Sequence, residues 1–173
     1  MASGNTETER KFLVRDSSYK DMATDSHRMV QGYICRETGR TVRVRISGDK
    51  GWLTIKGPSS GNGMSRYEWE REIPAGEAAE LMALCQKGII DKTRHIVPFD
   101  GHVFEVDEFH GDNEGLVVAE IELQNESEPF GRPEWLGEEV TGDRRYYNSM
   151  LTRCPFSVWD TCPPGQDGPG SGD

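Results

Sequence analysis

Hydrophobic and polar residues alternate along most of the chain between residues 6 and 150, and short breaker sequences interrupt this alternation. A period of two is typical of a β-strand, because successive side chains point to opposite faces. The pattern predicts eight strands, at residues 7–14, 31–36, 41–47, 50–56, 66–73, 93–99, 102–109 and 116–123. Tight-turn sequences at 48–51 and 100–101 each join two of these strands as a hairpin. Eight strands separated by turns favour a closed antiparallel barrel, a mainly β fold.

Two segments carry helical spacing instead. Residues 74–88 place apolar side chains three and four positions apart, and residues 143–152 place apolar and aromatic side chains on one side. We therefore expect a few helices packed outside the barrel. The chain of 173 residues has the length of one domain. From residue 155 it is rich in Pro, Gly and Asp, so we predict a barrel domain at 1–154 and a flexible tail at 155–173.

The charged residues follow a pattern that a solvated outer face does not explain when all strands are taken together. Like charges recur two positions apart, so they share one face of a strand, where neighbouring charges of the same sign repel. The acidic sets are Glu7 and Glu9, Glu68, Glu70 and Glu72, Glu105 and Asp107, and Glu120 and Glu122. The basic sets are Arg43 and Arg45, and Lys92 and Arg94, while Lys11 shares the face of the first acidic pair.

A ligand that carries charges of both signs would offset this repulsion. Mg²⁺ and Mn²⁺ take hard oxygen ligands such as carboxylates, and Lys and Arg hold a polyphosphate. One metal-bound triphosphate meets both needs. The interior of an eight-stranded barrel is just wide enough for one small elongated ligand. We therefore expect the charged strand faces to point inward and the apolar faces outward, under helices.

The sequence ETERKFLV at residues 7–14 resembles the E-x-E-x-K opening of the CYTH, or triphosphate tunnel metalloenzyme, family. Further blocks resemble the family's successive motifs in the same order, at residues 31–34, 42–45, 53–57, 68–70 with 73–74, 92–94, 105–109, 115–117 and 119–123. A run of motifs in order is far more specific than one short charge pattern. The resemblance covers roughly residues 6–151.

The resemblance implies a tunnel that uses Mg²⁺ or Mn²⁺ to act on triphosphate compounds, and it implies roles for individual residues. The implied metal ligands are Glu7, Glu9, Glu120 and Glu122, with Glu68, Glu70, Glu105 and Asp107 as further ligands or acceptors behind them. The implied phosphate-binding residues are Lys11, Arg43, Arg45, Lys56, Lys92 and Arg94, with Arg66 as a further candidate. Four carboxylate pairs exceed the needs of one metal, so we expect two metal positions. The candidate catalytic residues are Lys92, Tyr33 and Glu9, with Lys92 as a base that acts directly or through the tyrosine hydroxyl.

This set of residues favours a hydrolase that converts inorganic triphosphate to pyrophosphate and phosphate. Thiamine triphosphatase is an alternative, because Trp52 could stack on a cationic ring at the tunnel mouth. Class IV adenylyl cyclase is another, although it needs an adenine site that the sequence does not display. A non-catalytic module that binds polyphosphate or a nucleotide is the alternative from a different class.

The net charge of -10, from 20 basic and 30 acidic residues, repels nucleic acid and anionic membranes, so we expect neither as a partner. No apolar leader or membrane-spanning segment is visible, so we expect a cytoplasmic protein, monomeric or homodimeric. The four cysteines form no C-x-x-C pair, and we expect them to be reduced, although Cys154 and Cys162 could close a small loop.

Overall fold

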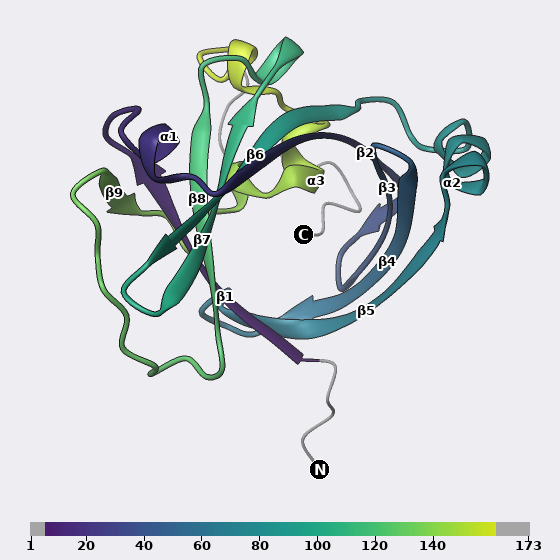
Figure 1. Ribbon diagram of the computed structural model, residues 1–173. Helices are drawn as coiled ribbons and strands as arrows, with labels where there is room; N and C mark the ends of the chain where they lie inside the picture. Colours follow the sequence, from purple (N-terminus) through teal and green to yellow (C-terminus); the bar gives the residue numbers. More distant parts are fainter. Residues whose placement is uncertain (1–5, 162–173) are drawn as a thin grey trace.

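The computed structural model describes residues 6–161. Within this range the strands are β1 (Thr6–Val14), β2 (Asp25–Glu37), β3 (Arg40–Ser47), β4 (Lys50–Ser59), β5 (Ser65–Pro74), β6 (Ile90–Phe99), β7 (His102–Phe109), β8 (Val117–Leu123) and β9 (Leu136–Glu139). They form one sheet in the order β5-β4-β3-β2-β6-β7-β8-β1-β9, and β1 also pairs with β5 (Figure 1). Every pair is antiparallel. The predicted closed eight-stranded antiparallel barrel is confirmed.

One edge of β1 carries both the seam of the barrel and the additional strand. Its first residues pair with β5, starting with Thr6 opposite Tyr67, and this pairing closes the barrel. Further along the same edge, β9 pairs with Phe12 and Val14. The sequence did not predict β9 because its four residues, Leu136–Glu139, do not alternate. β2 also begins six residues earlier than predicted, because its first residues are polar on both faces.

The helix predicted at 74–88 is shorter in the structure, where α2 spans Ala75–Met82. The chain turns away after this helix because the backbone N–H of Gln86 donates to the carbonyl oxygen of Tyr33 on β2. Gly88 then adopts a φ of 100°, a left-handed conformation that favours glycine. α2 lies outside the barrel against β2 to β5 (Figure 1).

The helix predicted at 143–152 is interrupted at Tyr147, whose backbone is extended. A 3₁₀ turn, η2 (Arg144–Tyr146), precedes this residue, and α3 (Asn148–Leu151) follows it. Three further short elements were not predicted: α1 (Tyr19–Met22), η1 (Gly111–Asn113) and η3 (Phe156–Val158). None of the helices within residues 6–161 has the length and apolarity needed to cross a bilayer.

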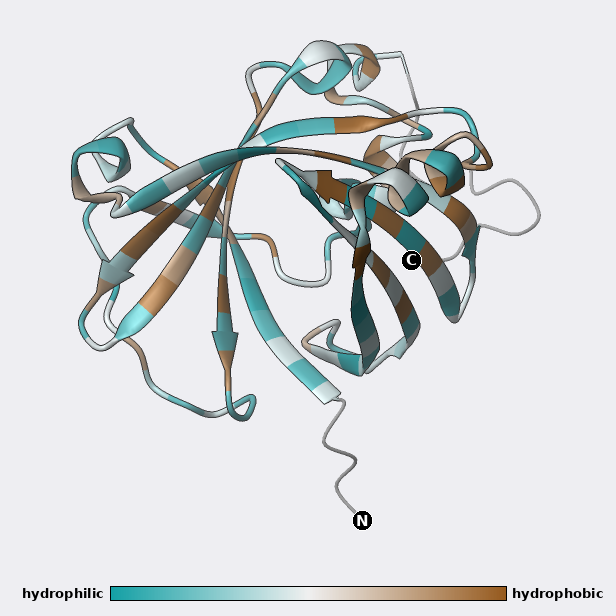
Figure 2. Ribbon diagram, turned by 45° about the vertical axis from the view of Figure 1, so that its right-hand side comes forward, coloured by the Kyte–Doolittle hydropathy of each residue, from teal (hydrophilic) through white to brown (hydrophobic). Residues whose placement is uncertain are grey.

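The main apolar core lies outside the barrel, on the outward faces of β1, β6, β7 and β8. Hydrophobic and hydrophilic residues alternate along these strands (Figure 2). The buried members of this core are Phe12, Tyr19, Val97, Phe104, Val106, Ala119, Ile121, Leu123, Trp135 and Leu136. Trp135 lies in the segment between β8 and β9, and its ring packs edge-on against Phe104 at 5.4 Å between centroids. An irregular segment, β9 and the short α1 therefore cover this face, where the sequence led us to expect helices.

A second apolar cluster lies inside one end of the barrel. Ile90 and Val118 are two residues from Lys92 and Glu120, so they share the inward faces of β6 and β8. The inward faces, which we expected to be the charged ones, are therefore apolar at this end. The buried members of the cluster are Ile90, Phe109, Leu116, Val118, Val140, Tyr146 and Leu151. Because η2 and α3 supply the last members, the segment after β9 closes this end of the barrel.

Part of the predicted tail packs onto this second cluster. Phe156 and Trp159 are partly buried against it, and their rings meet edge-on at 5.1 Å. The rest of the predicted tail, residues 162–173, lies outside the described residues. Cys35 and Cys85 are free, but Cys154 is disulfide-bonded, which corrects the expectation that it is reduced. Cys162 also lies outside the described residues.

We predict that Trp135→Ala lowers the free energy of unfolding by about 3–5 kcal/mol, because it removes a large side chain, 1% exposed, from the outer core. Urea unfolding followed by circular dichroism measures this loss. The matched control is Leu84→Ala, whose side chain is 68% exposed and whose loss should stay within about 0.5 kcal/mol. An equally small loss for Trp135→Ala would show that the segment before β9 does not form part of the core.

Candidate active site inside the barrel

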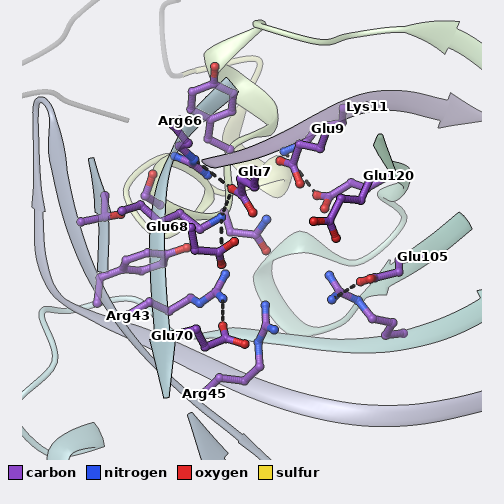
Figure 3. A pocket seen from close by; sticks show the side chains of 18 of the residues that line it. Glu7, Glu9, Lys11, Arg43, Arg45, Arg66, Glu68, Glu70, Glu105 and Glu120 are labelled. Atoms are coloured by element: carbon purple, nitrogen blue, oxygen red, sulfur yellow. Dashed lines mark hydrogen bonds and ion pairs between the residues drawn. The ribbon is translucent and has the colours of Figure 1, made fainter. Parts of the chain in front are cut away.

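The barrel encloses a cavity of about 190 Å³ whose wall consists mostly of charged side chains (Figure 3). Strand parity explains this wall, because the inward residues of β1, β3, β5, β6 and β8 are those that carry charge at every second position. The structure brings these predicted residues to the cavity: Glu7, Glu9, Lys11, Tyr33, Arg43, Arg45, Lys56, Glu68, Glu70, Lys92, Arg94, Glu105, Glu120 and Glu122. Arg66, the additional candidate, also lines it.

The acidic residues of β1 and β8 form one side of the cavity. In the register of these strands, Glu9 lies opposite Glu122, and Lys11 lies opposite Glu120. Burial raises the pKa of Glu9 to about 7, and the charge of Glu120 adds to this shift. Burial also opposes ionisation of Glu120, but Lys11, 3.4 Å away, together with Arg94 and Lys92 outweighs it, and the pKa of Glu120 falls to about 2. Lys56 and Lys11 also act on Glu9 but do not offset its burial, so Glu9 is the less compensated acid of this pair.

A second acidic group forms where β1 meets β5 at the seam. Lys56 lies 2.7 Å from a carboxylate oxygen of Glu7, and Arg66 lies 3.3 Å from the same oxygen. Burial and a hydrogen bond to Glu7 raise the pKa of Glu68 to about 8. Burial opposes the charge of Glu7, but the hydrogen bond from Glu68 and the two cations lower its pKa. Protonated Glu68 thus donates to ionised Glu7 across the seam.

The cations of β3 and β6 face these carboxylates. Burial, together with the neighbouring Arg43 and Arg94, lowers the pKa of Arg45 to about 9. Within residues 6–161, Arg45 has no carboxylate within 4 Å and donates instead to the amide oxygen of Gln31 at 3.0 Å. Burial also lowers the pKa of Lys92 to about 7, although Asp107 opposes the shift. The surroundings of Arg45 and Lys92 therefore compensate their positive charges only in part.

Asp107 is the one predicted site residue that does not line the cavity. Its side chain is 1% exposed, and one oxygen accepts from Lys92 at 2.8 Å. The other oxygen accepts from the Nε atom of Arg94 at 2.7 Å. Asp107 was predicted as a metal ligand or an acceptor behind the metal. The structure places it behind the two cations, where it fixes their positions.

Several cavity residues were missed by the sequence reasoning. Thr41 lies two positions before Arg43, so strand parity alone could have identified it. Tyr147, Asn148 and Ser149 come from the segment that closes one end of the barrel, where the helical pattern of residues 143–152 predicted a helix outside the barrel and did not indicate the cavity. The Tyr147 ring lies 5.2 Å from the Lys11 ammonium and 5.9 Å from the Arg66 guanidinium, a cation–π arrangement.

The donor chemistry of the acidic wall fits a hard divalent cation. Carboxylate oxygens are the ligands that Mg²⁺ and Mn²⁺ prefer, and a cation would relieve the repulsion between Glu9 and Glu120. In the part of the chain that the structure describes, no three Asp, Glu, His or Cys residues are already arranged around one point. The carboxylates lie instead against cations, as Glu7 does against Lys56, and Glu105 forms an ion pair with Arg94. The cavity therefore offers the type of ligand that such a cation prefers, but the ligands are not already arranged around a metal position.

Comparison with known proteins agrees with this arrangement. The CYTH domain model matches residues 5–152. The inorganic triphosphatase of Acetivibrio thermocellus is 50% identical over 151 residues, which are 87% of this chain and 95% of the relative. The inorganic triphosphatase of Nitrosomonas europaea is 35% identical over 150 residues, which are 84% of this chain and 96% of the relative. A crystal structure described as an inorganic triphosphatase superposes with a TM-score of 0.59 at 30% identity, covering 88% of this chain and 95% of that one. The chain belongs to the CYTH domain family.

Proposed function

We propose that this chain is a divalent-metal-dependent hydrolase that cleaves inorganic triphosphate to pyrophosphate and phosphate. The observation that carries the proposal is an enclosed cavity in which undercompensated cations face buried carboxylates. An anion with several charged oxygens, together with a divalent cation, satisfies both walls at once. The relatives described as inorganic triphosphatases, at 50% and 35% identity, support the same substrate.

The cationic wall would hold the phosphoryl oxygens. Arg45 and Arg94 offer planar forks that match phosphate oxygens, while Lys92 acts as a point charge. Arg43, Lys56 and Lys11 extend this wall along the cavity. Asp107 pairs with both Lys92 and Arg94, and Glu105 pairs with Arg94. Arg45, which has no carboxylate partner among the described residues, therefore supplies the uncompensated positive charge for a triphosphate.

The acidic wall would hold Mg²⁺ or Mn²⁺, and we propose two positions among its carboxylates. Glu9, Glu120 and Glu122 on β1 and β8 are the first candidate ligands, followed by Glu7 at the seam. When bound, a divalent metal neutralises phosphate charge and lowers the pKa of a water molecule. The residues of the two walls align the terminal phosphorus with an attacking water by fixing the phosphate chain between them.

Lys92 has two candidate roles that its contacts help to separate. Its ammonium donates to Asp107 at 2.8 Å and to Asn148 at 3.0 Å. No hydrogen bond among the described residues joins Lys92 to the Tyr33 hydroxyl, which instead receives a long contact of 3.5 Å from Gln31. We therefore propose that Lys92 holds a phosphoryl oxygen. Its action as a base, directly or through Tyr33, is the alternative.

A hollow beside the main cavity favours an organic triphosphate as the second candidate substrate. This hollow has a volume of about 250 Å³ and is lined in part by Met29, Trp52 and Ile96. It shares Arg45 and Arg94 with the main cavity, so the two spaces are adjacent. A cationic aromatic group such as that of thiamine triphosphate would stack on Trp52 while its phosphates occupied the charged cavity.

A phosphate-release panel tests the proposed function. With Mg²⁺ or Mn²⁺, the protein should release phosphate from tripolyphosphate and should leave the product pyrophosphate intact. Chelation by EDTA should abolish release, and added metal should restore it, because the carboxylate wall needs a cation. ATP and thiamine triphosphate complete the panel. A higher kcat/KM for thiamine triphosphate would favour the second candidate, and calorimetric binding of tripolyphosphate without release would make the chain a binding module.

We predict that Arg45→Met lowers kcat/KM for tripolyphosphate about 10- to 100-fold, because a charge-assisted contact to phosphate is lost. The melting temperature should stay the same or rise, because an enclosed cation without a carboxylate partner is removed. Arg28→Met is the matched control, since this arginine lies on the same sheet with its side chain 66% exposed and pairs with Asp91. Equal kcat/KM values for the two variants would refute the phosphate-binding role of Arg45.

The pair Lys92→Met and Tyr33→Phe separates the two roles of Lys92. If Lys92 holds phosphate, Lys92→Met should raise KM and lower kcat/KM, and Tyr33→Phe should keep kcat within about threefold of wild type. Proton transfer through the tyrosine would instead lower kcat of Tyr33→Phe by about 100-fold or more. Steady-state kinetics at saturating metal measures both, and circular dichroism confirms that each variant is folded.

A further inference from the structure

The closing segment after β9 brings an uncharged polar residue into the charged cavity. Asn148 is the first residue of α3 and lines the cavity beside the Lys92 ammonium. Its amide oxygen accepts a hydrogen bond from Lys92 at 3.0 Å and one from the Nε2 atom of Gln31 at 3.3 Å. Gln31 is fully buried on β2, so Asn148 is held from two sides.

The orientation of the Asn148 amide follows from its neighbours. Arg45 can only donate, and its Nε atom points at the amide oxygen of Gln31, so the Gln31 NH₂ group must face the other way, toward Asn148. The Lys92 ammonium can also only donate. Two donors therefore converge on Asn148, and the atom between them must be its oxygen.

The Asn148 NH₂ group is consequently turned away from Lys92 and Gln31. No hydrogen bond among the described residues uses this group, whereas the amide oxygen of the same side chain accepts two. Although the group has no hydrogen-bond partner among the described residues, it is not buried, so it stays accessible to a ligand. It is thus an available donor on a side chain that lines the proposed phosphate site.

We propose that Asn148 is a substrate-binding residue whose NH₂ group donates a hydrogen bond to a phosphoryl oxygen, while its amide oxygen positions Lys92. This inference rests on the proposed function and deepens it. A neutral donor suits this position because three cations, Arg45, Arg94 and Lys92, already line the same cavity. Gln31 is a positioning residue that links Arg45 to Asn148, so one chain of hydrogen bonds aligns an arginine, an amide and a lysine.

Steady-state kinetics on tripolyphosphate with Asn148→Ala tests the proposal. We expect kcat/KM to fall about 10- to 100-fold, the range for a lost hydrogen bond to a charged oxygen. Asn125→Ala is the matched control, because this asparagine is exposed in the segment after β8 and its side chain bonds, among the described residues, only with Ser127. Its kcat/KM should equal that of wild type. Unchanged kcat/KM for Asn148→Ala would overturn the proposal.

A double-mutant cycle with Lys92→Met separates direct binding from positioning. If the NH₂ group contacts phosphate, Asn148→Ala should still lower kcat/KM at least several-fold in the Lys92→Met background. If Asn148 acts only by positioning Lys92, its effect should vanish there, and the direct contact is overturned. Where turnover is too slow, the Kd of tripolyphosphate from titration calorimetry provides the same cycle. Wild-type protein that releases no phosphate from tripolyphosphate would refute the proposed function itself.

Discussion

Charge compensation inside the barrel is the constraint on which the rest of the structure depends. The strands carry much of their apolar surface outward, so their charged residues meet in an enclosed interior, where an uncompensated charge costs about several kcal/mol. Ion pairs between strands reduce this cost: Asp107 on β7 holds Lys92 and Arg94 on β6, and Glu7 on β1 holds Lys56 on β4. The Asp107 contacts join two consecutive strands, whereas the pair from β1 to β4 joins strands farther apart in the sequence, across the seam of the barrel.

The compensation is incomplete, and the uncompensated groups are those that face the cavity. Glu9 has a pKa of about 7 because it is buried near Glu120, and Arg45 has one of about 9 because it is enclosed among cations. A protein core optimised for stability alone would not retain both groups. Because both groups face one cavity, a ligand that carries charges of both signs would stabilise both of them. The cations also orient the neutral amides, since Arg45 donates to the oxygen of Gln31 and Lys92 donates to the oxygen of Asn148.

An interior of this kind needs other sources of stability outside it. Trp135 and the segment before β9 cover the outward faces of β1, β7 and β8, and α2 covers β2 to β5. Ala78 of α2 sits so close to β4 that a Cβ atom at Gly51 would lie 2.4 Å from its own, which requires a glycine there. At one end of the barrel the inward faces become apolar, and residues such as Ile90 pack under the segment that contains Tyr146. The cavity is therefore closed by hydrophobic packing at the end where Asn148 enters it.

The sequence by itself determined the eight strands of the barrel, its closure and the inward set of charges, because alternation with a period of two is a local property that survives in the fold. It placed Glu9, Arg45 and Lys92 on faces that do line one cavity. Only the tertiary structure decided which of these charges are paired: Asp107 has the same parity as its neighbours, yet its contacts with Lys92 and Arg94 remove it from the cavity wall. Likewise, the position of Asn148 depends on how the segment after β9 folds back over the end of the barrel. Its contact with Gln31 joins residues more than a hundred positions apart, and no local sequence pattern encodes such a contact.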